Sequence, residues 1–92
     1  MILNGNYQIV ITKEAQKDKE KVKRVPALRR RAEELLEILR EDPFQTPPPY
    51  EKLQRDLKGS YSRRLNRQHR IVYTVDEIRK VVKITAMWTH YE

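Results

Sequence analysis

Apolar residues recur with a helical period in the first half of the chain. Within 28–39, leucine and alanine side chains fall at i, i+4, i+7, i+8 and i+11, and charged residues fill the opposite side. Pro26 suits the first turn of this helix, and Asp42-Pro43 ends it. The pattern therefore predicts an amphipathic helix between these two breaks.

A β-branched run upstream of this helix predicts a first strand over residues 7–12. Thr12 is a suitable N-cap for a helix over 13–25. The apolar stripe of that helix is limited to Ala15 and Val22. We therefore expect contacts with the rest of the fold, rather than its own amphipathicity, to stabilise it.

The pattern changes after residue 42. Four of the five prolines lie within 43–50, which predicts a stiff, extended connection. Leu53 and Leu57 then indicate a period of two. Alternating residues over 61–66 and 69–75 predict a hairpin around Arg67-Gln68, and 81–87 predicts a last strand.

These elements follow the order β-α-α-β-β-β-β. We expect one α+β domain over residues 1–92, with a mostly antiparallel sheet and two helices packed on one face. In the hairpin, alternation places Leu65, Ile71, Tyr73 and Val75 on the core side. Arg64 and Arg70 then emerge together on the opposite side.

The chain has 20 basic and 13 acidic residues, a formal charge of +7, which favours polyanionic partners. The basic residues are concentrated in two zones, 13–31 and 51–70. Cysteine is absent, which excludes thiolate catalysis and zinc–cysteine sites. No apolar run approaches the length of a membrane span, and residues 1–6 lack a secretion signal. We expect a cytoplasmic protein without a cofactor.

The residues with the most informative chemistry are those needed to cut RNA with its own 2′-hydroxyl group. Glu51 is the only carboxylate from Pro43 to Arg55, and it is the candidate general base. Arg64 and Arg70 can hold a phosphate through two N–H groups each. His90 is the candidate acid, and Tyr91 can stack on or orient a base. This scheme needs no metal.

Simpler roles remain open for several of these residues. Glu51 can form a structural ion pair with Arg63 or Arg64, and His90 alone can be a solvated terminal residue. His69 is expected to make a structural hydrogen bond within the hairpin. A metal site formed by Glu51, His69 and His90 is a minor alternative.

Five separately placed elements of the sequence also resemble one family. They are Glu51-x-Leu53, Leu57-x-Gly59-x-Tyr61, Ser62-Arg63-Arg64, His69-Arg70-Ile71-Val72-Tyr73 and His90-Tyr91. In order and spacing they resemble the Txe/YoeB toxins of bacterial toxin–antitoxin systems, within the wider RelE-like endoribonucleases. The preceding helices and Asp42-Pro43-Phe44 fit as well.

The resemblance implies a RelE-like fold and a toxin that cleaves mRNA in the ribosomal A site, leaving a 2′,3′-cyclic phosphate and a 5′-hydroxyl. It implies Glu51 as general base, Arg70 as the phosphate-stabilising arginine and His90-Tyr91 as the terminal catalytic pair. Arg64 would be a further RNA contact, and we add Arg63, Lys52 and Arg55 as RNA-binding candidates. The implied partners are the ribosome, mRNA and an acidic antitoxin, in a homodimer or a toxin–antitoxin hetero-oligomer.

The sequence departs from the family pattern at three places. Pro47-Pro48-Pro49-Tyr50 makes the approach to Glu51 stiffer, Gln54 stands where a lysine is common, and Glu92 follows the terminal pair. Lys52 or Arg55 can replace the missing lysine charge. Two other functions stay open: a ParE-like toxin that binds DNA gyrase without a nuclease site, and a non-catalytic RNA-binding module.

Overall fold

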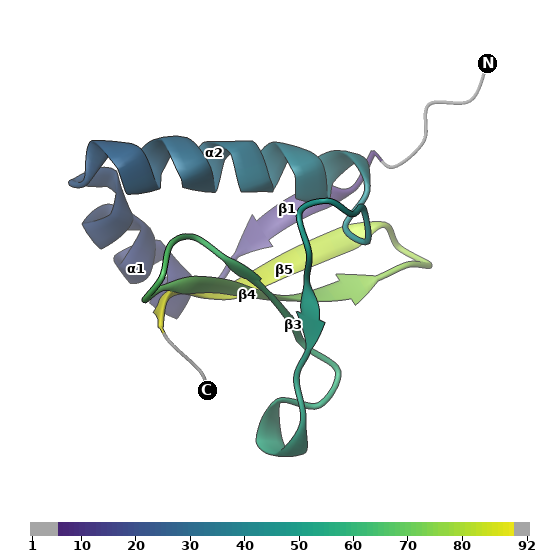
Figure 1. The fold of residues 1–92 in the computed structure, drawn as a ribbon. Helices are drawn as coiled ribbons and strands as arrows, with labels where there is room; N and C mark the ends of the chain where they lie inside the picture. The colour runs from purple at the N-terminus through teal and green to yellow at the C-terminus, as the bar shows by residue number, and fades with distance from the viewer. Residues whose placement is uncertain (1–5, 90–92) are drawn as a thin grey trace.

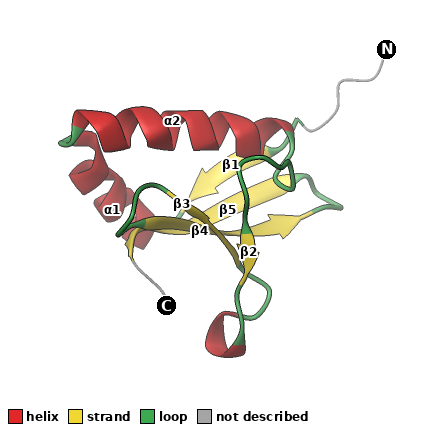
Figure 2. Ribbon diagram, in the orientation of Figure 1, coloured by secondary structure: helices red, strands yellow, loops and turns green. Residues whose placement is uncertain are grey.

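The computed structural model describes residues 6–89. The elements are β1 (Gln8–Ile11), α1 (Lys13–Lys23), α2 (Pro26–Glu41), β2 (Glu51–Lys52), the 3₁₀ helix η1 (Arg55–Leu57), β3 (Tyr61–Arg64), β4 (Arg70–Asp76) and β5 (Val81–Thr89). Apart from η1, this is the predicted order of helices and strands (Figure 2).

The strands form one sheet in the order β1-β5-β4-β3-β2. β1 runs parallel to β5, and the other three pairings are antiparallel. Both helices lie on one face of this sheet (Figure 1). The predicted α+β class, with a mostly antiparallel sheet and helices on one side, is therefore confirmed.

Both helices begin where the sequence predicts, whereas α1 ends at Lys23, two residues earlier than predicted. The Thr12 hydroxyl accepts a hydrogen bond from the Ala15 N–H at 3.1 Å and caps α1, and Pro26 occupies the first turn of α2. Their buried faces carry the predicted apolar residues: Ala15, Val22, Leu28, Ala32, Leu35 and Leu39. Within residues 6–89, neither helix has the length and apolar character needed to cross a membrane.

The core lies between these helix faces and the sheet. Ile71, Tyr73 and Leu65 from the hairpin are buried in it, as predicted from the alternation. β5 contributes Val82 and Ile84. Because successive strand residues point to opposite faces, the residues adjacent to these buried ones in each strand point to the face of the sheet that the helices leave open.

Two details of the middle of the chain differ from prediction. Residues 43–50 are not a straight connection, because the chain turns at Pro43-Phe44 and bends again at Pro47-Pro48. Leu57 lies in η1 rather than in a strand, since β2 ends at Lys52. Both segments lie beside the candidate site, where their shape matters.

Candidate functional site

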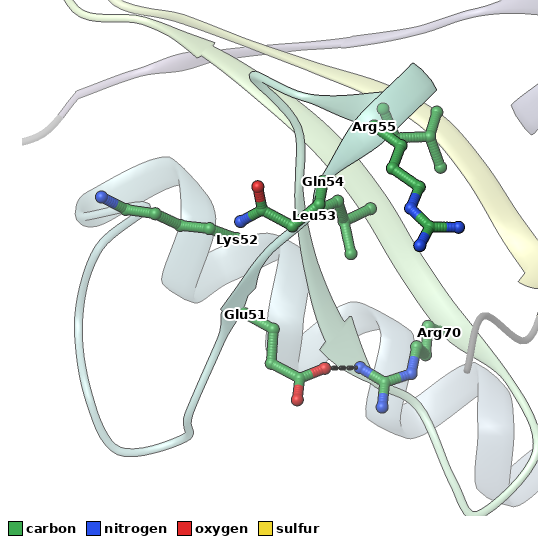
Figure 3. Close-up of a pocket in the computed structure, with 7 residues that line it drawn as sticks. Glu51, Lys52, Leu53, Gln54, Arg55 and Arg70 are labelled. Atoms are coloured by element: carbon green, nitrogen blue, oxygen red, sulfur yellow. Dashed lines mark hydrogen bonds and ion pairs between the residues drawn. The ribbon is translucent and has the colours of Figure 1, made fainter.

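The register of the sheet brings three polar side chains together on its open face. Glu51 in β2 lies opposite Ser62 in β3, and Arg64 in β3 lies opposite Arg70 in β4. Arg70 Nη1 donates to Ser62 Oγ at 3.0 Å and forms an ion pair and hydrogen bond with Glu51 Oε1 (Figure 3). The predicted general base and the predicted phosphate-stabilising arginine are thus in direct contact, although they lie nineteen residues apart in the sequence.

The two partners of this ion pair differ in exposure. The Arg70 side chain is only 12% exposed, whereas that of Glu51 is 63% exposed. Ser62, which is fully buried, therefore helps to fix the guanidinium from the protein side. Because one partner is solvated, the ion pair adds little to stability, and an incoming phosphate can compete for Arg70.

A hollow of about 700 Å³ opens on one side of the Glu51–Arg70 pair. The rest of its wall is formed by residues from β2 to η1: Lys52, Leu53, Gln54, Arg55 and Leu57. Its mixture of leucine side chains and polar groups suits a nucleotide. In Figure 3 the Arg55 guanidinium points toward the side where Arg70 lies, and Lys52 points away from it.

A second hollow, of about 200 Å³, opens beside the same pair. Glu51, Ser62 and Arg70 line it together with Arg64. Arg64 is exposed and forms no ion pair with other residues of the 6–89 range. The prediction that Arg64 and Arg70 emerge together is confirmed, and the structural pairing considered for Glu51 is made with Arg70 rather than with Arg63 or Arg64.

The prediction that Arg63 binds RNA is wrong, because its side chain is buried. Its relative exposure is 1%. Nε donates to the Tyr73 hydroxyl at 3.0 Å, Nη1 to the Pro48 carbonyl at 2.7 Å, and Nη2 to the carbonyls of Pro43 at 2.8 Å and Gln45 at 2.9 Å. Four of the five guanidinium N–H groups are used within the protein, so Arg63 is not available to RNA.

The contacts of Arg63 explain how the proline-rich segment holds its shape. Three of its acceptors are carbonyl groups between residues 43 and 48, a stretch in which the prolines offer no backbone N–H for a sheet. The Tyr50 ring lies 5.2 Å from the guanidinium carbon, within cation–π range. Arg63 therefore fixes the segment that leads directly into Glu51.

The Tyr73 hydroxyl accepts a hydrogen bond from Arg63 and donates one to the Pro43 carbonyl at 3.2 Å. Burial raises the pKa of Tyr73 above its usual value of 10.0, although the positive charge of Arg63 lowers it. Above about pH 10 the unfolded chain loses this proton while the folded protein keeps it, so the free energy of unfolding falls as pH rises. We expect a steeper alkaline loss of stability in wild type than in Tyr73→Phe. Urea titrations between about pH 8 and pH 11 measure both slopes, and equal slopes would contradict this role.

The predicted terminal pair, His90 and Tyr91, lies outside the described residues. Thr89, the last residue of β5, pairs with Arg70 in the sheet register. The described part of the chain therefore ends in a strand residue paired with Arg70 of the Glu51–Arg70 site. Just before this point the Trp88 ring stacks on the buried His69 ring, with centroids 3.9 Å apart and planes at 22°. His69 thus packs against the end of β5.

Asp18 is a supporting residue that the sequence did not reveal. Its Oδ2 accepts from the backbone N–H groups of Met87 at 3.0 Å and Trp88 at 3.3 Å. The contact joins α1 to the end of β5 across about seventy residues, so no local pattern announces it. It fixes the end of β5 against α1.

We expect Asp18→Ala to lower the free energy of unfolding by about 1.5–3 kcal/mol, because two backbone donors lose a charged acceptor. Chemical denaturation measures the loss. Glu20→Ala is the matched control, since that carboxylate lies on the same helix and, among residues 6–89, pairs only with exposed Lys23 at 3.9 Å and Gln16 at 3.4 Å. Equal stabilities of the two variants would show that the Asp18 contact contributes nothing.

No group of three or more histidine, cysteine, aspartate or glutamate residues within 6–89 is arranged to hold a metal ion. The minor alternative of a Glu51, His69 and His90 site includes a residue beyond this range. Within the described range, His69 stacks on Trp88 through its ring face. The geometry at Glu51 is that of a carboxylate and an arginine facing two open hollows, which suits acid–base chemistry on a phosphate.

Comparisons with known proteins identify relatives of this chain. A relative named Toxin YoeB from Synechocystis sp. is 34% identical over 77 residues, which cover 84% of this chain and 79% of the relative. A YoeB/ParE toxin from Agrobacterium tumefaciens superposes with a TM-score of 0.83 at 26% identity, over 91% of this chain and 99% of that one. The toxin in a YoeB–YefM complex from Staphylococcus aureus gives a TM-score of 0.77 at 32% identity, over 92% and 98%.

The sequence model of one family also matches nearly the whole chain. It is described as the YoeB-like toxin of the bacterial type II toxin–antitoxin system, and the match runs over residues 11–91. This range contains Glu51, Arg64 and Arg70 as well as the terminal pair. The chain therefore belongs to the YoeB-like toxins of bacterial type II toxin–antitoxin systems.

Proposed function

We propose that the protein is a ribosome-dependent endoribonuclease that cleaves mRNA in the A site and so inhibits translation. The observation that carries the proposal is the contact of Glu51 with Arg70 at the junction of two open hollows. An exposed carboxylate beside a fixed guanidinium supplies a proton acceptor and a phosphate ligand, the two groups with which 2′-hydroxyl attack begins. Membership of the YoeB-like family supports the same activity.

In this reaction Glu51 accepts the proton of the 2′-hydroxyl group, and the 2′-oxygen attacks the adjacent phosphorus. The bond from phosphorus to the 5′-oxygen breaks, and His90 gives that oxygen a proton. The products are a 2′,3′-cyclic phosphate and a 5′-hydroxyl, so atoms and charges balance without an added reactant. Each proton transfer is worth about 10²–10⁴-fold in rate.

Positive charge around the phosphate makes the second contribution. Arg70 releases Glu51 as the substrate enters and donates to the phosphate oxygens, on which negative charge develops. Arg64, exposed in the neighbouring hollow, adds a further donor. Lys52 and Arg55 contact the RNA in the larger hollow, and Tyr91 stacks on or orients a base.

The regulating partner in this proposal is an acidic antitoxin. The S. aureus relative is found in a complex with YefM. A net charge of +7 gives this chain a surface that attracts an acidic, partly disordered chain, which folds on binding. We propose that toxin and antitoxin assemble in the cytoplasm, where the ribosomal substrate is found.

The test is to add purified protein to translating ribosomes and map new 5′ ends in the mRNA. Wild type should create ends within A-site codons, and Glu51→Ala and His90→Ala should not. Intact mRNA combined with gyrase-linked DNA breaks would favour the ParE-like function instead. Binding of RNA without cleavage by any of the three proteins would favour a non-catalytic RNA-binding module.

A further inference from the structure

The smaller hollow contains a residue that belongs to neither the predicted site nor the hairpin. Arg31, from α2, lines it together with Arg64 and Arg70. In the sequence, Arg31 ends the first basic zone and the other two belong to the second. The fold therefore joins the two zones at one place, beside the Glu51–Arg70 pair.

The charge and size of this hollow suit an RNA phosphate. Three arginines and one carboxylate residue, Glu51, line the hollow, which leaves an excess of positive charge. A volume of about 200 Å³ lies below the range of about 300–1,000 Å³ typical of small-molecule pockets, so a phosphate with its sugar fits better than a whole nucleotide. Pro48 and Pro49 form part of the wall and supply no backbone N–H, so arginine side chains must provide the donors there.

Arg31 is free to change partners when a phosphate arrives. Its ion pair with Glu34 is 3.6 Å long, and the two side chains are 36% and 57% exposed. A long, solvated i,i+3 pair of this kind is weak. A phosphate that accepts two N–H groups from the guanidinium is a stronger partner than this single long contact.

We propose that Arg31, with Arg64, binds the mRNA phosphate next to the cleaved linkage. This subsite rests on the proposed nuclease function and extends it to a specific contact. Arg70 lies at the junction of both hollows and serves the reacting phosphate, while Arg31 approaches from α2 on the side of the smaller hollow. The subsite fixes the position of the strand, and Arg31 itself takes no part in proton transfer.

The matched pair Arg31→Gln and Arg30→Gln tests the subsite. Both variants lose one positive charge from adjacent positions of α2, but only Arg31 lines the hollow, and Arg30 is exposed. We expect Arg31→Gln to slow single-turnover cleavage on programmed ribosomes by about 5- to 20-fold, and Arg30→Gln by less than about 2-fold. Thermal unfolding within about 3 °C of wild type confirms that both variants are folded.

A second arm identifies the phosphate. Two synthetic mRNAs each carry one neutral methylphosphonate, at the linkage before or after the cleaved one. The nucleotide on the 5′ side of the methylphosphonate has a 2′-O-methyl group, which keeps the RNA intact. A control mRNA has the 2′-O-methyl group alone. One methylphosphonate should slow wild type by about 5- to 20-fold and slow Arg31→Gln by a smaller factor, because only Arg64 remains to contact that phosphate.

Each other outcome overturns the subsite in a recognisable way. Equal rates for Arg31→Gln and Arg30→Gln would mean that Arg31 acts only through overall charge. A slow Arg31→Gln protein that remains as sensitive as wild type to both methylphosphonates would assign Arg31 to another ligand, such as a ribosomal RNA phosphate. Failure of wild type to cleave at all would instead overturn the nuclease function, and the subsite with it.

Discussion

Arg70→Ala is expected to slow mRNA cleavage by about 10²–10³-fold, because a fixed donor is lost where negative charge develops in the transition state. The side chain is held by Ser62 Oγ and Glu51, so its position is set before the substrate binds. It lies on the face of the sheet opposite the buried Ile71, and its removal leaves the core unchanged. Single-turnover cleavage on programmed ribosomes measures the effect.

The controls for this prediction separate charge from position. Arg67→Ala removes the same charge from an exposed loop residue that lines neither hollow and should retain cleavage within about 2-fold of wild type. Arg70→Lys should restore only part of the rate, because an ammonium group cannot reproduce the forked geometry. Circular dichroism showing that Arg70→Ala is unfolded would contradict the assigned role, as would undiminished cleavage by a folded variant.

Arg63→Met is expected to lower the free energy of unfolding by about 3–5 kcal/mol, because a buried network of hydrogen bonds loses its central donor. Methionine fills much of the same space, but the carbonyl groups of Pro43, Gln45 and Pro48 all lose their bonds to the guanidinium. Segment 43–50 then loses its anchor to the sheet. Urea denaturation followed by circular dichroism measures the loss.

Arg64→Met is the matched control, since it makes the same substitution at the next residue of the same strand. Arg64 is exposed and should contribute less than about 0.5 kcal/mol to stability, while its loss weakens RNA cleavage. Arg63→Met should thus lower stability, whereas Arg64→Met should lower the rate of cleavage. A fully stable Arg63→Met protein would mean that the network around its guanidinium does not hold the proline-rich segment.

The periodicity of the hairpin predicts the exposed position of Arg64 correctly. Because strand residues alternate, placing Leu65 and Ile71 in the core placed Arg64 and Arg70 on the opposite face, where the structure has them. The same alternation puts Arg63 on the core side with Leu65. The alternation therefore favours a buried Arg63, whereas its charge and its polar neighbours favour a surface position, and the structure follows the alternation.

Distant contacts explain what the sequence could not predict. The carbonyl acceptors of Arg63 lie 15 to 20 residues away along the chain, in a segment without periodicity. Asp18 reaches the end of β5 across about seventy residues. Arg31 belongs to a helical face that composition alone describes as solvated. Only the assembled sheet and helices bring it to the hollow beside Arg70.

The most direct test of the account compares wild-type cleavage of two mRNAs that differ only in the 2′-hydroxyl group of the cleaved nucleotide. The account predicts a 5′ fragment ending in a 2′,3′-cyclic phosphate from the ribonucleotide substrate, and no cleavage at that linkage when the nucleotide is 2′-deoxy. Cleavage of the deoxy substrate at the same linkage and a comparable rate would contradict it. Glu51 would then have no 2′-hydroxyl proton to accept, and the role assigned to the Glu51–Arg70 pair would be wrong.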